Sequence, residues 1–200
     1  MSGKFPAVIL AVCCLISACS SGKANTLAAS AESAVVNSGA LATITQNYAA
    51  SKFVAERITE DELNPVLQAG VRSPSARNRQ PWHFTVVRGD AELAGGIIPN
   101  ITAGNVIIVI SGEGADTDKS VVLDCALATQ NIYLAAQALG LGSRIYTGPI
   151  DTVNAKYRES LGLPGGYSAV ALVRIGRIEP VDALSAASSR KNPDGMISGR

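Results

Sequence analysis

A run of five consecutive β-branched residues, from Val106 to Ile110, constrains the fold of this chain more than any other segment. Successive side chains of a strand point to opposite faces of its sheet, so an apolar run that does not alternate is typical of a strand buried on both faces. We therefore predict a central strand over Asn105–Ser111.

Three other segments have strand patterns. Residues from Trp82 to Arg88 alternate, with Trp82, Phe84 and Val86 on one face and His83, Thr85 and Val87 on the other. Ser143–Tyr146 is short and strand-like, and Ala169–Ile175 is apolar enough for a second buried strand.

Helix signals lie between these strands. Thr59 and Glu62 have the spacing of a capping box, which predicts a helix that continues to about Ala69. Gly70 suits the left-handed residue that ends such a helix. Asp151 can cap another helix, which would run to about Leu161.

The longest predicted helix follows the loop Gly112–Thr117 and ends at Gly140 and Gly142. The segment Asp116–Lys119 is expected to cap and solvate its start. Apolar residues recur along it at helical spacing: Val121, Val122, Ala128, Ile132, Ala135, Ala136 and Leu139. The order of helices and strands indicates an α+β or α/β domain.

The first residues predict export. Lys4 precedes an apolar run too short to span a bilayer, and Ile16-Ser17-Ala18-Cys19 resembles the lipobox of bacterial lipoproteins. We expect a signal peptide over residues 1–18, a lipidated Cys19 and tether over residues 19–38, and one folded domain over residues 39–200. The alternative is an ordinary cleaved signal peptide with an incidental cysteine. The anchor would place the protein on the cell membrane or outer membrane, at the periplasmic or extracellular face.

Cysteine usage and charge exclude several classes of protein. Cys13 and Cys14 leave with the signal peptide and Cys19 carries lipid, so only Cys125 remains and no intrachain disulfide is expected. Cys125 lies in an apolar helical pattern, which favours a buried side chain over a reactive thiol. One histidine and one thiol cannot build a zinc site, so no metal is expected. A net charge of +1 without basic runs gives no electrostatic case for nucleic acid.

Two segments resemble those of a known family. Ser73-Pro74-Ser75-Ala76-Arg77-Asn78-Arg79-Gln80-Pro81-Trp82-His83-Phe84 is similar to the P-S-x-x-N-x-Q-P-W-x-F segment that nitroreductases place beside their flavin. The long helix is similar to their D-x-x-x-A-x-Q-N-x-x-L-A-A-x-x-L-G-L-G-S pattern, from Asp124 to Ser143. Thr147-Gly148-Pro149, Ile175-Gly176 and the pair Arg190-Lys191 follow in the family order, and the resemblance covers roughly Tyr48 to Ile197.

The resemblance implies a mixed sheet flanked by helices, an intertwined homodimer, and FMN in the groove between the two subunits. By position, Ser75 and Asn78 would contact the flavin ring or ribityl chain. Thr147 and Gly148 would lie near the flavin edge, where a backbone N–H can bond the reactive nitrogen. Arg190 or Lys191 would meet the phosphate. The flavin carries the redox chemistry, and no side chain is assigned a catalytic role.

The chain departs from the family in its first segment. Nitroreductases usually begin the domain with R-x-S-x-R before an aromatic residue, and those arginines bind the FMN phosphate. Aligned on Phe53, this chain has Asn47, Ala49 and Ser51, and Lys52 is one residue out of register. Each lost charged hydrogen bond would weaken phosphate binding by about 1.5 to 3 kcal/mol.

The second departure is a short connection between Arg88 and Asn105, where relatives carry longer helical material over the substrate side of the flavin. This pocket is expected to be more open, and an open pocket discriminates weakly among substrates.

Structural interpretations stand beside these functional ones. Ser75 and Asn78 lie in a turn-rich loop, where such side chains often bond their own backbone. Trp82 fits a core position, and His83 fits a structural role on the opposite face of its strand. Arg77 and Arg79 are either solvated loop charges or replacements for the missing arginines.

Two functions remain open. The first is an FMN-dependent oxidoreductase that reduces a nitroaromatic, a quinone or another small flat electron acceptor, with NAD(P)H or an exported redox partner as electron donor. The second is a non-enzymatic binding lipoprotein on a nitroreductase scaffold that has lost tight FMN binding. The missing R-x-S-x-R and the short connection motivate the second hypothesis.

Overall fold

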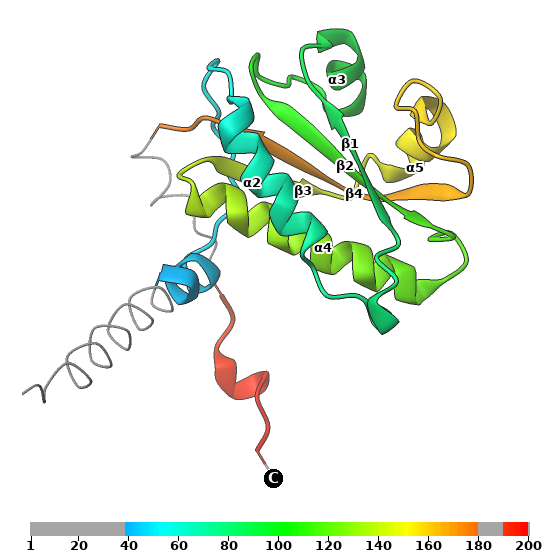
Figure 1. Ribbon diagram of the computed structural model, residues 1–200. Helices are drawn as coiled ribbons and strands as arrows, with labels where there is room; N and C mark the ends of the chain where they lie inside the picture. Colours follow the sequence, from blue (N-terminus) through cyan, green and yellow to red (C-terminus); the bar gives the residue numbers. More distant parts are fainter. Residues whose placement is uncertain (1–38, 180–189, 200) are drawn as a thin grey trace, which may run out of the picture. The chain divides into compact units, whose positions relative to one another are not determined.

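The structure is a computed structural model that describes residues 39–179 and 190–199 (Figure 1). The expected signal peptide, the tether and Cys19 lie outside the described residues. Among the helices of the described part, none combines the length and the apolar character that a membrane crossing requires.

The chain forms a four-stranded sheet in the order β1-β2-β4-β3. The strands are β1 (Trp82–Val87), β2 (Val106–Glu113), β3 (Gly142–Tyr146) and β4 (Tyr167–Gly176). All four predicted strands are confirmed. Every neighbouring pair of these strands is antiparallel, so the described sheet is not mixed in strand direction.

Strand β2 is central, as predicted. The side chains from Val106 to Ile110 are all 0% exposed, and they contribute alternately to two cores. Ile108 and Ile110 belong to one core and Ile107 and Val109 to the other. The expected alternation in β1 is confirmed as well, since Phe84 packs against the first core and Val87 belongs to the second.

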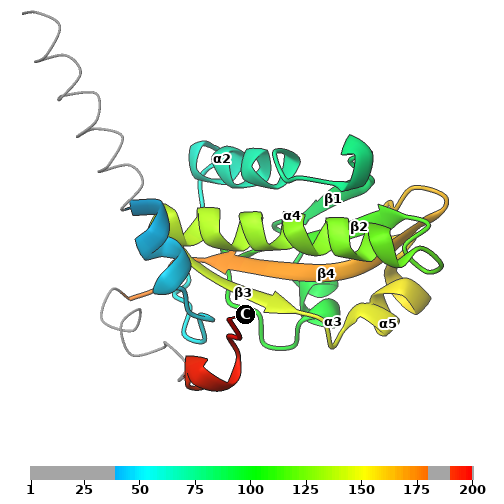
Figure 2. The ribbon, with the colours of Figure 1, turned by 90° about the horizontal axis from the view of Figure 1, so that it is seen from below.

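Helices cover both faces of the sheet (Figures 1 and 2). The layer on the first core consists of α2 (Glu60–Val71) and α4 (Lys119–Ala138), which pack against each other. The layer on the second core consists of α3 (Ala91–Ile97), the short α5 (Ile150–Thr152) and the π-helical turn η2 (Val153–Tyr157). The α+β class is confirmed.

The start of α2 is confirmed and its end is not. Thr59 Oγ1 accepts the Glu62 N–H and the Glu62 carboxylate accepts the Thr59 N–H, which completes the capping box. The prediction that Gly70 ends the helix in a left-handed conformation is wrong. Gly70 lies inside α2, where a Cβ would stand 2.7 Å from Ile132 Cγ1. This glycine serves the close approach of α2 to α4.

The long helix α4 has the expected boundaries. Asp118 is its N-cap and accepts the Ser120 N–H. Beyond the helix, Gly140 has φ +74°, and the N–H groups of Gly140 and Leu141 donate to the carbonyls of Gln137 and Ala136. This pair of bonds is a Schellman motif, which requires a left-handed residue at Gly140.

The helix predicted from Asp151 is wrong in its start and its length. Its N-cap is Pro149, Asp151 lies one residue inside α5, and the regular α-helix gives way to the π-helical turn at Val153. Asp151 is therefore an acidic residue of the first turn. Its negative charge interacts favourably with the positive end of the helix dipole, but its side chain does not cap the helix.

The Schellman glycine gives a test of the fold. Gly140→Ala should destabilise the protein by about 1 to 2 kcal/mol, because a Cβ is disfavoured at positive φ. Nothing lies within 4 Å of that Cβ, so steric contact adds no further cost. Gly95→Ala is the matched control, because Gly95 lies inside α3 with equally open space around a Cβ. This control should stabilise by up to about 1 kcal/mol. Urea unfolding at fixed protein concentration measures both changes, and equal effects would contradict the assignment.

The buried thiol gives a second test. Cys125 is 0% exposed, and burial, with a smaller effect of Asp124, raises its pKa to about 12. The reactive thiolate is therefore scarce at pH 8. A soluble domain beginning at Ser20 contains this cysteine alone. We expect a chromogenic disulfide reagent to leave the native domain unlabelled and to label it fully in urea. Rapid labelling of the native domain would contradict this burial.

Candidate functional site

A backbone loop in an unusual conformation precedes β1. Three residues of this loop, none of them glycine, have left-handed backbone angles: Arg77 at φ 56°, Asn78 at φ 55° and Gln80 at φ 51°. The single turn η1 (Ala76–Asn78) contains two of them. Asparagine tolerates this region better than most residues, whereas each of the other two costs roughly 1 to 3 kcal/mol. Such strain persists only where the surroundings hold the loop.

Helix α4 supplies that support. Asp124, which is 3% exposed, accepts the Ala76 N–H through Oδ1 at 2.9 Å. The Arg79 guanidinium lies 3.3 Å from the Asp118 carboxylate at the start of the same helix. The Arg79 guanidinium therefore already has a carboxylate partner within its own chain. Asp124 is part of the family pattern, and the contact that explains its presence could not be read from the sequence.

Ser75 makes the backbone bond that the structural interpretation expected, whereas the side chain of Asn78 bonds another side chain. Ser75 Oγ accepts the Gln80 N–H at 3.0 Å, and Asn78 Oδ1 accepts from Gln80 Nε2 at 3.1 Å. Both bonds use acceptor oxygens. The Ser75 hydroxyl hydrogen and the Asn78 amide hydrogens remain as donors, and Asn78 is exposed.

Thr147 and Gly148 follow the end of β3. Both are exposed, and nothing lies within 4 Å of a Cβ built on Gly148. A flat ring can therefore approach the backbone closely at this point. This open space is the feature that the expected flavin edge requires.

One chain does not bring these two groups together. The loop of Ser75 and Asn78 leads into β1, at one edge of the sheet, whereas Thr147 and Gly148 follow β3 at the other edge. Strands β2 and β4 lie between them, which places the edge strands roughly 14 Å apart at the usual strand spacing. The register shows that β1 begins at the end of the sheet toward which β3 runs.

The segment that lacks the family arginines lies beside β3. The Ala50 N–H donates to the Ser143 carbonyl at 2.9 Å, and Tyr133 Oη of α4 donates to Asn47 Oδ1 at 3.4 Å. Burial raises the pKa of the Tyr133 hydroxyl, and a hydrogen bond with Gln137 and, to a smaller extent, the positive charge of Arg190 counteract part of that rise. Arg190 therefore acts electrostatically next to the position at which the first missing arginine was expected. Lys191 is exposed.

Two arginines inside the strands were not predicted as site residues from the sequence. Arg174 of β4 is 7% exposed, and Arg144 of β3 is its direct partner in the strand pairing. Their signal is a charged residue inside an otherwise apolar strand. The register that places them side by side is invisible in the sequence.

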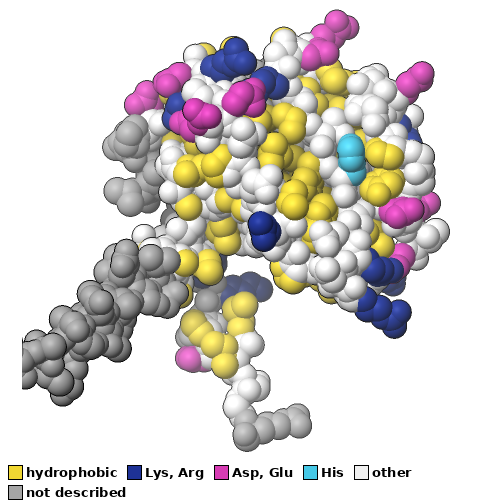
Figure 3. Space-filling view, in the orientation of Figure 1, with side chains coloured by type: hydrophobic (Ala, Val, Ile, Leu, Met, Phe, Trp, Pro, Cys, Tyr) yellow, Lys and Arg dark blue, Asp and Glu magenta, His cyan; other side chains and the backbone are white. Residues whose placement is uncertain are grey.

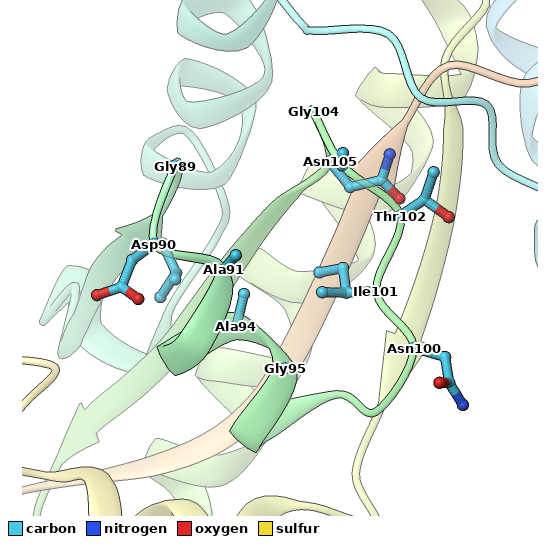
Figure 4. Close-up of a pocket in the computed structure, with 12 residues that line it drawn as sticks. Gly89, Asp90, Ala91, Ala94, Gly95, Asn100, Ile101, Thr102, Gly104 and Asn105 are labelled. Atoms are coloured by element: carbon cyan, nitrogen blue, oxygen red, sulfur yellow. The ribbon is translucent and has the colours of Figure 1, made fainter.

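The connection between β1 and β2 contains α3 and borders a cavity of about 330 Å³ (Figure 4). Ala91, Ala94 and Gly95 of α3 line one side, and the segment from Asn100 to Asn105 lines the other. The short connection therefore folds into a helix of its own, beside a cavity at the end of β1 opposite to the Ser75 loop.

The remaining aromatic residues have structural positions. Trp82 packs against the first core and stacks on Phe84, with 6.5 Å between the ring centroids. His83 meets Tyr167 edge to face at 6.0 Å. In the part of the chain that the structure describes, no group of three or more His, Cys, Asp and Glu side chains is placed to hold a metal ion.

Comparison with known proteins gives a consistent relationship. The Nitroreductase family model matches residues 44–103 and 94–177. An Archaeoglobus fulgidus protein with the provisional name NADH dehydrogenase/NAD(P)H nitroreductase is 33% identical over 148 residues, which cover 69% of this chain and 84% of that protein.

Solved structures share the fold. A provisionally named nitroreductase of Desulfovibrio desulfuricans in complex with FMN has a TM-score of 0.69 and 26% identity, over 80% of this chain and 96% of the other. A Bacteroides fragilis nitroreductase with bound FMN has a TM-score of 0.65 and 22% identity, over 80% of this chain and 98% of the other. The family match and the Archaeoglobus relative both span most of the folded domain, and this chain belongs to the nitroreductase family.

Proposed function

We propose that this protein is an FMN-dependent oxidoreductase that works as a homodimer and reduces a small flat acceptor such as a nitroaromatic or a quinone. The observation that carries the proposal is the end of β3, where exposed backbone at Thr147 and Gly148 has open space beside it. FMN in the related Desulfovibrio structure supports the choice of cofactor.

The residues present fit this cofactor. Bound FMN would supply the two-electron chemistry. Thr147 and Gly148 would border the ring with backbone N–H groups. Arg190 would meet the phosphate, as its place in the family order implies, and its charge acts on Tyr133, which donates a hydrogen bond to Asn47. Ser75 and Asn78 would donate hydrogen bonds from the second subunit, since within one chain two strands separate them from β3.

The exposed face of α4 supports the homodimer. Leu123, Leu127 and Val122 are 63%, 40% and 38% exposed, which is unusual for large aliphatic side chains along one helix. Figure 3 looks onto the α2 and α4 layer and shows hydrophobic side chains at its surface. We infer that a second copy of the chain covers this face.

The proposed electron donor is argued from the expected location and from the name of a relative. The name of the Archaeoglobus relative includes NAD(P)H. We propose NAD(P)H or an exported redox partner as donor, the latter because nicotinamides are scarce outside the cytoplasm. The protein would be exported and anchored through Cys19 at the periplasmic or extracellular face of the cell membrane or the outer membrane. The lipobox resemblance of Ile16-Ser17-Ala18-Cys19 supports the anchor.

Titration with FMN tests the proposed cofactor. The soluble domain from Ser20 onward should quench flavin fluorescence with a saturable Kd in the micromolar range or tighter. Arg190→Gln should weaken FMN binding about 10- to 150-fold, the equivalent of one charged hydrogen bond, and should leave riboflavin binding unchanged because riboflavin lacks the phosphate. Arg72→Gln, at the exposed end of α2, removes an equal charge as control. Absence of saturable FMN binding would point to the binding lipoprotein instead.

Replacement of Cys19 tests the anchor. The unchanged protein, expressed in a bacterium with the lipoprotein pathway, should fractionate with membranes and should carry the mass of acyl chains on a cleaved N-terminus. Cys19→Ser should abolish acylation, because serine lacks the thiol. Cys125→Ser is the control and should keep the acyl mass. A Cys19→Ser protein that still carries the acyl mass would falsify the anchor.

A further inference from the structure

Two like charges face each other across β3 and β4. Arg144 and Arg174 are register partners, so their side chains lie on the same face of the sheet. It is the face of the second core, because Leu172 belongs to that core, Tyr146 packs against it, and the two are register partners on the same two strands. Like charges directly opposite in a sheet are destabilising, so an anion beside them would stabilise this arrangement.

Among the described residues, the hydrogen-bond and ring partners of Arg174 include no anion. Its Nε donates to Asn105 Oδ1 at 2.7 Å, its Nη2 donates to Thr102 Oγ1 at 2.9 Å, and its guanidinium lies 4.0 Å from the Phe53 ring centroid. These three partners are neutral. Among residues 39–179 and 190–199, no carboxylate forms an ion pair with Arg144 or Arg174. A buried guanidinium held only by neutral groups is costly, since its desolvation is not repaid by an opposite charge.

A polar group beside Arg174 also lacks an acceptor. Asn105 is 7% exposed, and its Nδ2 has no hydrogen-bond acceptor among the described residues. A Cβ built on Gly176 would overlap Asn105 Nδ2 and the Phe53 ring, so glycine is required there for this packing. The group thus holds a cation and an unused donor in fixed positions.

The position of the two arginines relates them to the missing family residues. Arg174 stacks on Phe53, the aromatic residue that follows the R-x-S-x-R segment, and Ser51 stands where its second arginine was expected. Arg144 lies 5.5 Å from the ring centroid of Tyr146, which directly precedes Thr147. The two cations therefore lie between the segment that lost its arginine and the end of β3 that would border the flavin.

We propose that Arg174 and Arg144 replace the arginine missing at Ser51 and bind the electronegative oxygens of FMN. The inference rests on the proposed function and deepens it. In relatives this cation would come from the N-terminal segment, and here it comes from the sheet. A guanidinium suits the task because its planar donors can meet a phosphate or a ring carbonyl in fixed geometry. The pairing with Phe53 and Asn105 fixes Arg174 before the cofactor arrives.

The test measures FMN and riboflavin affinity of the soluble domain by fluorescence titration. Arg144→Gln and Arg174→Gln should each weaken FMN binding at least about tenfold, the loss expected for one charged hydrogen bond. Adding Ser51→Arg to each variant should return the affinity to within about threefold of the unchanged protein, because the charge is then restored from the family position. Arg72→Gln is again the matched control. Circular dichroism verifies folding, and Arg144, which is only partly buried, keeps the test valid if Arg174→Gln does not fold.

The two ligands distinguish the atoms that are bound. A loss for FMN alone assigns the arginines to the phosphate, and an equal loss for riboflavin assigns them to the ring or ribityl oxygens. Unchanged FMN affinity in a folded variant overturns the inference while the proposed function stands. A loss that Ser51→Arg does not recover overturns the replacement of the missing arginine. Absence of FMN binding by the unchanged protein overturns the inference together with the proposed function.

Discussion

Burial of β2 on both faces is the constraint on which the rest of the structure depends. Since Val106–Ile110 is fully buried, the strand needs a neighbour at each edge and helices over each face. Strands β1 and β4 are those neighbours, and β3 extends the sheet beyond β4. The edges of the sheet are thus β1 and β3. The segments expected to touch a flavin lie just before one edge strand and just after the other.

Periodicity and capping residues predicted most of this fold, because they report on a single segment and its immediate neighbours. All four strands and the start of α2 followed from such local patterns. Gly70 and Asp151 show where local patterns fail. A glycine near a helix end suits a left-handed turn and a close helix contact equally well, and only the position of Ile132 decides between them. Asp151 could cap a helix, yet the chain turns two residues earlier at Pro149.

The candidate site was predictable only in part, because its components depend on pairing across the sheet. The family resemblance predicted the Ser75 loop and Thr147 with Gly148 as parts of the site from the residue types alone. The contact of Asp124 with that loop, and the pairing of Arg144 with Arg174, depend on register and helix placement. Comparison with the family pattern therefore reveals the positive charge missing at Ser51. It does not reveal the positive charges of Arg144 and Arg174, which the sheet brings near that segment.

The strained loop before β1 is shaped by its own subunit, through the bond from Ala76 to Asp124. A second subunit would receive it already ordered, so assembly loses little loop entropy. A binding site with one wall from each chain makes assembly and cofactor occupancy linked equilibria. The free energy by which the flavin tightens the dimer equals the free energy by which dimerisation tightens the flavin. If both chains form the site, dilution of the protein dissociates the dimer and releases the cofactor, just as a lower cofactor concentration does.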